Sequence, residues 1–298
     1  RRLEGALETY MDWLAADYGE PVPGGLRLGV DCAHGAAHLA GPRLLRRVGV
    51  HVQAIGDAPD GRNINAGVGS THLDALAELV RSHGLDGGLA FDGDADRCLA
   101  VDSRGRPVNG DAVIAALAID RHRRGALDAG RVVVTSMTNL GFHRLMAEHG
   151  IAVEVTDVGD RYVLERMLAT GATLGGEQSG HVIDLVHHTT GDGLATALML
   201  LAALARLDTD LDAVAELVTP FPQRLVAVPA DRAALPGARA VWQAVRAAEA
   251  ELGADGRVVL RASGTEQVVR VMVEAADETQ CQAICDRLAG IVRREIGV

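Results

Sequence analysis

The sequence is poor in cysteine and aromatic residues, and positive charge is outnumbered by negative charge. The four cysteines form no C-x-x-C pair, and the four-residue spacing of Cys281 and Cys285 is more often coincidental than metal-binding, so we expect reduced thiols in a cytoplasmic protein. We expect no signal peptide and no membrane partner, because no apolar run is long enough to span a bilayer. The net charge of −11 argues against nucleic acid as a partner, since phosphate backbones require a basic surface.

Hydrophobic residues and glycine are abundant instead. The chain has 298 residues, 48% of them hydrophobic and 23% charged, which is sufficient for packed cores and predicts two or three domains. The 35 glycines, with aromatics at only 3%, are typical of α/β proteins with tight turns between strands and helices. A small phosphorylated ligand remains compatible with the negative charge, because it needs only a local cationic pocket.

Apolar periodicity divides the chain into three parts. Strand and helix patterns alternate up to residue 109 and then restart, which favours mixed or parallel sheets in two similar α/β domains. After Pro220 and Pro222 the pattern changes to that of a small α+β domain. We therefore predict an α/β protein whose domains cover residues 1–109, 110–219 and 220–298.

Two helices are predicted from helical spacing and their flanking residues. One covers residues 71–83, with Ser70 or Thr71 as its N-cap, since hydroxyl side chains are favoured there. The other is a long helix over residues 192–207.

The first motif with chemical meaning is F-D-G-D-A-D-R, which begins at Phe91. Asp92, Asp94 and Asp96 follow a predicted strand directly, and crowded carboxylates cost free energy unless a cation compensates them. Their oxygens suit a hard divalent ion such as Mg²⁺, against the alternative of a solvated acidic turn. An EF-hand is excluded, because Arg97 occupies its glycine position and a serine its final glutamate position. An aspartyl-phosphate hydrolase loop matches less well, since such loops usually have Thr or Val in place of Asp96.

The second motif is G-G-E-Q-S-G-H, which ends at His181. Its glycines allow the backbone to approach a ligand closely. Glu177 and Ser179 have groups that bind the hydroxyls of a sugar, and His181 has a ring that binds phosphate or transfers a proton. The alternative is an ordinary glycine-rich loop.

The third motif, R-A-S-G-T-E, begins at Arg261. We expect Gly264 to adopt a positive φ that turns backbone N–H groups toward an anion, with hydroxyl donors from Ser263 and Thr265. Arg261 adds a planar guanidinium that matches phosphate, against the alternative of a hairpin turn with an incidental arginine. Arg270 follows on the next strand, where alternation leaves open whether it faces the same site.

The three motifs, in this order, resemble domains two, three and four of the α-D-phosphohexomutases, over essentially the whole chain. Further segments are similar to bacterial phosphoglucosamine mutases: D-C-A-H-G-A-A from Asp31, P-D-G-R-N-I-N, G-S-T-H, and D-V-G-D-R-Y-V around Asp160. Three positions depart from that pattern, since His34 replaces Asn, Val68 replaces Cys, and Gln267 replaces a common Pro.

The resemblance implies a mutase that interconverts glucosamine 6-phosphate and glucosamine 1-phosphate through a bisphosphorylated sugar, towards UDP-N-acetylglucosamine and peptidoglycan precursors. It implies Mg²⁺ as cofactor, held by Asp92, Asp94 and Asp96, with Arg97 at the transferring phosphoryl group and Asp160 and His181 as candidates for proton transfer. The implied substrate-binding residues are Glu177, Ser179, Arg261, Ser263, Gly264, Thr265 and Arg270.

In this family a phosphoserine in a T-A-S-H-N-P-like loop supplies the phosphoryl group. None of the six serines lies in such a loop, and Ser82, the nearest match, is followed by His83 and Gly84. We therefore expect a fragment that lacks the N-terminal phosphoserine domain and is inactive alone. A phosphomannomutase/phosphoglucomutase and a non-catalytic phosphosugar-binding protein remain alternatives, and the oligomeric state stays open, a homodimer included.

Overall fold

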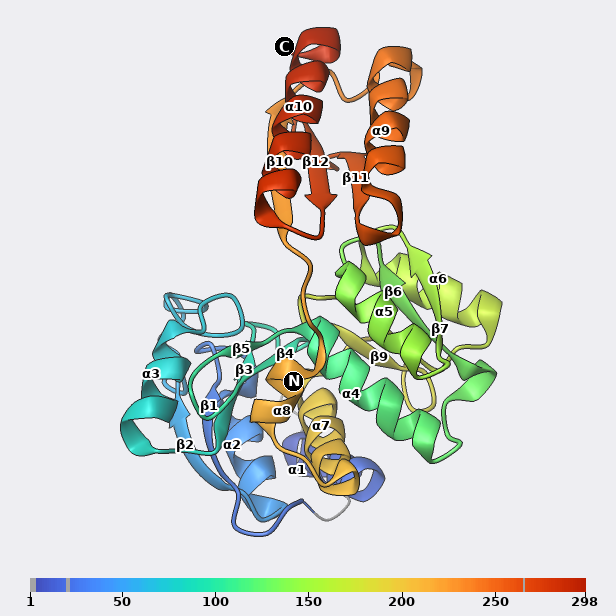
Figure 1. Cartoon of the computed structure of the whole chain (residues 1–298). Coiled ribbons are helices and arrows are strands. Elements are labelled where there is room, and N and C mark those ends of the chain that lie inside the picture. Colours follow the sequence, from blue (N-terminus) through green and yellow to red (C-terminus); the bar gives the residue numbers. More distant parts are fainter. Residues whose placement is uncertain (1–3, 20–21, 265) are drawn as a thin grey trace. The chain divides into compact units, whose positions relative to one another are not determined.

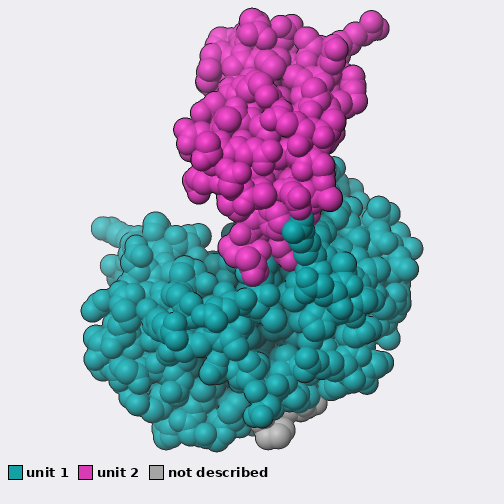
Figure 2. Space-filling model, in the orientation of Figure 1, with its two compact units in different colours: residues 1–138, 142–218 teal, residues 139–141, 219–298 magenta. Residues whose placement is uncertain are grey.

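The computed structural model describes residues 4–19, 22–264 and 266–298, and the chain divides into two compact units (Figures 1 and 2). Unit 1 comprises residues 1–138 and 142–218, and unit 2 comprises residues 139–141 and 219–298. Unit 1 contains a five-stranded and a four-stranded sheet, and unit 2 contains a three-stranded sheet.

The first sheet of unit 1 has the strand order β2-β1-β3-β4-β5. Strands β1, β2 and β3 are parallel, and β4 and β5 continue the sheet in antiparallel pairs. The strands are β1 Arg27–Asp31, β2 His51–Ile55, β3 Gly87–Phe91, β4 Cys98–Val101 and β5 Pro107–Val108, and the helices of this part are α1 Ala6–Tyr18, α2 Ala37–Arg47 and α3 Asp74–His83.

Helix α3 begins three residues later than the sequence predicts, and the predicted cap is wrong. Its N-cap is Leu73, which makes no side-chain capping bond. The backbone N–H of Ser70 donates to the carbonyl of Phe91 at 2.8 Å, which fastens this stretch to the end of β3. A tertiary bond therefore holds Ser70 and Thr71 outside the helix.

The second sheet of unit 1 repeats the arrangement of the first. Its order is β7-β6-β8-β9, with β6, β7 and β8 parallel and β9 antiparallel to β8. The prediction of two similar mixed α/β parts is confirmed, and the long helix predicted over residues 192–207 is α7. The elements are α4 Gly110–Arg123, η1 Asp128–Gly130, β6 Arg131–Thr135, α5 Leu140–Glu148, β7 Ala152–Thr156, α6 Asp160–Thr170, β8 Leu174–Gly176, β9 Val182–Asp184, α7 Gly193–Leu207 and α8 Leu211–Leu217.

One hydrophobic core joins the two sheets of unit 1. Helices α4 and α7 pack against each other and are almost wholly buried, and their side chains share a cluster with Leu28 and Phe91 of the first sheet and Val134 and Leu174 of the second. Smaller clusters around α3 and around α6 fill the outer sides of the two sheets. The loops of both sheets are therefore fixed relative to one another within this unit.

Unit 2 is an antiparallel sheet of order β10-β12-β11, against which α9 and α10 pack side by side (Figure 1). It has its own hydrophobic core, separate from that of unit 1. No helix in the described ranges is long and apolar enough to cross a membrane. The elements are β10 Gln223–Pro229, η2 Leu235–Gly237, α9 Arg239–Leu252, η3 Gly253–Asp255, β11 Arg257–Ala262, β12 Val268–Glu274 and α10 Glu278–Ile296.

A buried carboxylate explains why residues 139–141 belong to unit 2. Glu274 is fully buried, and its Oε2 accepts from Arg257 Nε at 2.7 Å and from the backbone N–H of Leu140 at 3.0 Å. Its Oε1 accepts from Asn139 Nδ2 at 3.2 Å. The charge is therefore paired and hydrogen-bonded, as burial requires.

Candidate metal and sugar-phosphate sites

The loops after β1 and β3 leave the carboxyl ends of two neighbouring parallel strands. Strands β2 and β3 lie on opposite sides of β1, and this is the point of an open α/β sheet where ligands generally bind. The loops after β1 and β3 touch there, with the backbone N–H of Ala36 donating to the carbonyl of Gly93 at 2.8 Å. A Cβ on Gly35 would lie 2.2 Å from that carbonyl oxygen, so this close approach requires glycine.

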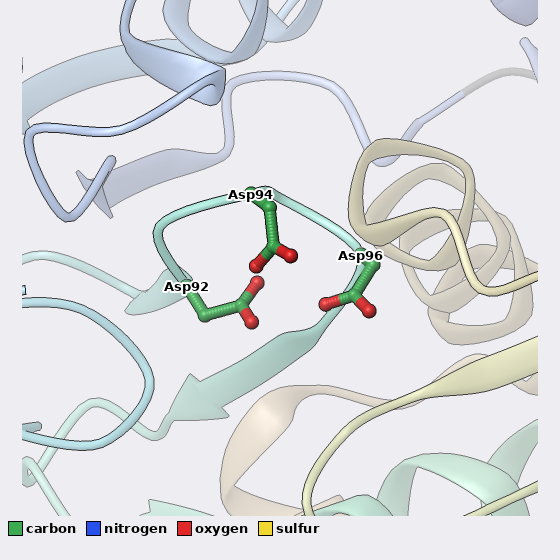
Figure 3. Close-up of side chains that lie close together, drawn as sticks. All are labelled: Asp92, Asp94 and Asp96. Carbon is green, nitrogen blue, oxygen red and sulfur yellow. The ribbon is translucent and has the colours of Figure 1, made fainter. Parts of the chain in front are cut away.

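The three aspartates converge in the loop between β3 and β4, which we call the acidic loop (residues 92–97). Asp92 Oδ1 accepts from the backbone N–H of Arg97 at 3.2 Å, and Ala95 turns the chain with a φ of 63°. As Figure 3 shows, the carboxylates of Asp92, Asp94 and Asp96 then gather in one place, with one ligand oxygen of each within 4.8 Å of the others. The structure thus brings together the three predicted metal ligands.

This crowding is electrostatically costly without a cation. Burial, followed by the hydrogen bond and charge of Asp96 and the charge of Asp94, raises the pKa of Asp92 to about 6, although the Arg97 N–H opposes the rise. Arg97 Nε lies 3.7 Å from Asp92 Oδ2 and 3.8 Å from Asp96 Oδ1, which only partly compensates. Asp96 Oδ1 is buried without a hydrogen-bond partner among the described residues. Three crowded carboxylate oxygens whose charge is only partly compensated fit a hard divalent cation.

The second predicted motif forms the tight turn between β8 and β9. The backbone N–H of Glu177 donates to the carbonyl of His181 at 2.9 Å, and Ser179 is exposed in the turn. Glu177 Oε1 accepts from the backbone N–H of Gly159 at 3.0 Å, so its carboxylate is oriented by the loop before α6. Asp160, the first residue of α6, is exposed.

His181 belongs to the surroundings of the acidic loop. Its side chain is only 3% exposed, and its Nε2 accepts from the backbone N–H of Gly191 at 3.2 Å and lies 3.6 Å from Asp96 Oδ2. His181 and Arg97 also form an isolated antiparallel β-bridge. This places His181 beside the metal ligands.

The third predicted motif is the loop of the β11–β12 hairpin in unit 2. Arg261 and Arg270 are directly opposite each other in register, so both lie on the same face, where like charges destabilise the sheet unless an anion lies nearby. Arg270 is paired with Glu266 at 2.9 Å. Ser263 is buried, and its Oγ accepts from the Glu266 N–H at 3.3 Å. Thr265 lies outside the described residues.

The expectation for Gly264 is wrong, and a residue outside the motifs shapes this loop. Gly264 does not adopt a positive φ. Instead, Arg232 Nη1 donates to the carbonyls of Ser263 at 2.8 Å and Gly264 at 3.0 Å. Since the C=O and N–H of one peptide point in opposite directions, the bond to the Ser263 carbonyl turns the Gly264 N–H away from Arg232. No sequence pattern indicates Arg232, because it precedes the loop by some 30 residues.

Comparison with known families assigns three models to the chain. The phosphoglucomutase/phosphomannomutase alpha/beta/alpha domain II matches residues 8–105, domain III of the same family matches residues 109–221, and its C-terminal domain matches residues 225–291. The acidic loop, the Glu177 turn and the Arg261 loop fall one in each of these matches.

Curated relatives are phosphoglucosamine mutases. The enzyme of Thermobifida fusca is 52% identical over 92% of this chain and 61% of its own length. The enzyme of Rubrobacter xylanophilus is 51% identical over 99% of this chain and 66% of its own length. The chain therefore spans 61–66% of the length of these relatives.

Solved structures share the fold. N-acetylphosphoglucosamine mutase of Aspergillus fumigatus, in complex with GlcNAc-6P and magnesium, has a TM-score of 0.80 at 22% identity, over 98% of this chain and 66% of the other. A phosphoglucomutase/phosphomannomutase family protein of Burkholderia thailandensis has a TM-score of 0.79 at 22% identity, over 97% and 64%.

Proposed function

The chain belongs to the phosphoglucomutase/phosphomannomutase family, and from this premise we propose that its function is that of a phosphoglucosamine mutase. Such an enzyme is an isomerase that interconverts glucosamine 6-phosphate and glucosamine 1-phosphate. The observation that carries the proposal is the identity of 51–52% to phosphoglucosamine mutases over 92–99% of the chain. The converging aspartates support the same reaction class, because phosphoryl transfer relies on positioning and charge neutralisation.

In this proposal Asp92, Asp94 and Asp96 hold Mg²⁺, the metal in the Aspergillus fumigatus complex. When bound, Mg²⁺ would neutralise charge on the transferring phosphoryl group. Arg97 is held beside the same carboxylates, with its Nε 3.7 Å from Asp92, and its guanidinium offers planar donors to phosphoryl oxygens. The raised pKa of Asp92 and the unpartnered oxygen of Asp96 support a cation at this position.

The Glu177 turn and the Arg261 loop are proposed to bind the substrate. The Gly159 N–H occupies Glu177 Oε1 and orients the carboxylate, whose Oε2 can accept from a sugar hydroxyl, and Ser179 is exposed to donate to another. Arg261, Ser263, Gly264, Thr265 and Arg270 are proposed to hold the phosphate that is not reacting. Such a contact contributes binding energy remote from the chemistry.

Asp160 and His181 stay the candidates for proton transfer, and the geometry favours Asp160. Asp160 is exposed at the start of α6, whereas His181 is buried with its Nε2 already accepting a hydrogen bond. No serine in the 298 residues lies in a T-A-S-H-N-P-like loop, so we propose that this chain by itself binds the sugar phosphate without turnover. We also propose a cytoplasmic location, supported by four free cysteines.

The proposed binding is tested by ³¹P NMR of glucosamine 6-phosphate titrated with the chain in Mg²⁺. We expect a saturable change of the phosphorus signal that Arg261→Ala abolishes. The control is Arg161→Ala, because Arg161 is an exposed arginine on α6 that forms an ion pair with Glu165 on the same helix. No signal change with the wild-type chain, or an undiminished change with Arg261→Ala, would contradict the proposal.

A further inference from the structure

A short segment that follows β9 and ends at the first residue of α7 contacts the acidic loop from the other sheet of unit 1. The segment is Gly191-Asp192-Gly193, which we call the GDG segment. We propose that its three residues are positioning residues that hold the acidic loop in the shape that binds a divalent cation. The inference rests on the proposed metal site and adds to it the residues that give the site its geometry.

Gly193 contacts the turn of the acidic loop directly. Its backbone N–H donates to the carbonyl of Ala95 at 2.9 Å. A Cβ at this position would lie 2.5 Å from the carbonyl oxygen of Arg97 and 2.9 Å from that of Ala95. Both of these neighbours are backbone atoms, so a larger residue would displace the acidic loop itself. The turn that places Asp94 and Asp96 therefore depends on a glycine far away in the sequence.

Gly191 lies close to the backbone of the acidic loop and to the side chain of His181. A Cβ here would lie 2.4 Å from His181 Nε2 and 2.8 Å from the carbonyl oxygen of Asp96. The Gly191 N–H donates to His181 Nε2, which lies 3.6 Å from Asp96 Oδ2. The same nitrogen of His181 thus lies near both Gly191 and the Asp96 carboxylate, and the ring limits where that carboxylate can move.

Asp192 anchors the segment between two helices. Its Oδ1 accepts from the backbone N–H groups of Leu194 at 2.9 Å and Ala195 at 3.0 Å, which caps α7. Its Oδ2 accepts from the hydroxyl of Tyr10 on α1 at 2.7 Å. Both carboxylate oxygens are therefore used, one to start α7 and one to tie that start to α1.

Electrostatics explains why the acidic loop needs an external support. Three carboxylates within 4.8 Å repel one another, so a free loop would separate them in the absence of metal. Contacts from the GDG segment oppose this separation, and a site that is already formed binds a cation more tightly. Gly191 and Gly193 are buried, and Leu194 and Ala195, which follow them directly, belong to the core that both sheets share, so the segment has a rigid base.

The test measures Mn²⁺ affinity of the 298-residue chain by electron paramagnetic resonance, with metal-free thermal stability measured separately. Gly193→Ala is expected to weaken Mn²⁺ binding by about 10- to 100-fold, as changes behind metal ligands do. Tyr10→Phe keeps the ring and removes only the bond to Asp192, so we expect a loss of about 3- to 10-fold. The matched controls are Gly24→Ala, because Gly24 has open space around it, and Tyr162→Phe, because Tyr162 is 46% exposed.

The outcomes separate this inference from the proposed metal site. Weaker Mn²⁺ binding by both variants, with unchanged controls, supports the positioning role. Wild-type affinity in folded Gly193→Ala and Tyr10→Phe chains overturns it, whatever their thermal stability, and Tyr10→Phe decides alone if Gly193→Ala does not fold. A wild-type chain that binds no Mn²⁺ contradicts the proposed metal site and the positioning role together.

Discussion

Asp92→Asn is expected to make the metal-free chain more stable at neutral and alkaline pH while it abolishes metal binding. In the folded chain burial and neighbouring carboxylates raise the pKa of Asp92 from 3.8 to about 6. The folded state therefore binds more protons than the unfolded state between these values, and the resulting stabilisation is lost as the pH rises through about 6. Asn keeps an oxygen to accept from the Arg97 N–H, which Asp92 does at 3.2 Å, but it has no charge to repel.

The magnitude follows from the two pKa values. Each pKa unit corresponds to about 1.4 kcal/mol, so the ionised Asp92 destabilises the metal-free folded chain by at most about 3 kcal/mol above pH 7. The difference between variant and wild type should shrink as the pH falls toward 4, because protonated Asp92 carries no charge either. Mg²⁺ should raise the stability of the wild type and leave Asp92→Asn unchanged, since a ligand stabilises only the state that binds it.

The assay is urea unfolding with EDTA at pH 5 and pH 8, followed by tryptophan fluorescence. The chain has two tryptophans, Trp13 in unit 1 and Trp242 in unit 2, so a Trp242→Phe background makes the signal specific for the unit that contains Asp92. An Asp92→Asn chain that is no more stable than wild type at pH 8 in EDTA would refute the electrostatic reasoning.

Three further variants test other parts of the account. Arg232→Ala should weaken glucosamine 6-phosphate binding by about 5- to 10-fold in calorimetry, since two loop carbonyls lose their donor, and should leave Mn²⁺ affinity unchanged; equal sugar-phosphate affinity would contradict the role of Arg232. Glu274→Gln should destabilise unit 2 by about 3–5 kcal/mol in urea unfolding followed by Trp242 fluorescence, because Arg257 loses a buried partner; a cost below about 1 kcal/mol would contradict this. Glu177→Gln should lower sugar-phosphate affinity by about 10-fold with little change in thermal stability, and unchanged affinity would remove Glu177 from the proposed site.

The three metal ligands could be predicted from sequence because they lie close together along the chain. Asp92, Asp94 and Asp96 alternate within one hairpin loop, and the strands on either side fix the direction of that loop. The two similar α/β parts could also be predicted, because buried parallel strands appear in the sequence as runs of apolar residues. These features depend on neighbours along the chain.

The surroundings of the loop could not be predicted in the same way. The start of α3 is set by the bond from Ser70 to the carbonyl of Phe91, which no local pattern encodes. The glycines of the GDG segment are recognised only when Ala95 and Asp96 are seen beside them, and Gly264 differs from expectation because Arg232 holds its carbonyl. In each case a contact between distant residues decides the local conformation.

We propose above all that this chain binds the phosphate ester of an amino sugar in preference to other hexose phosphates. The most direct test is calorimetric titration of the 298-residue chain in Mg²⁺ with glucosamine 6-phosphate, glucose 6-phosphate and mannose 6-phosphate, with Arg261→Ala as the control. We expect the tightest binding for glucosamine 6-phosphate, and we expect Arg261→Ala to abolish it. Equal or tighter binding of glucose 6-phosphate or mannose 6-phosphate would contradict it and favour a phosphomannomutase/phosphoglucomutase instead.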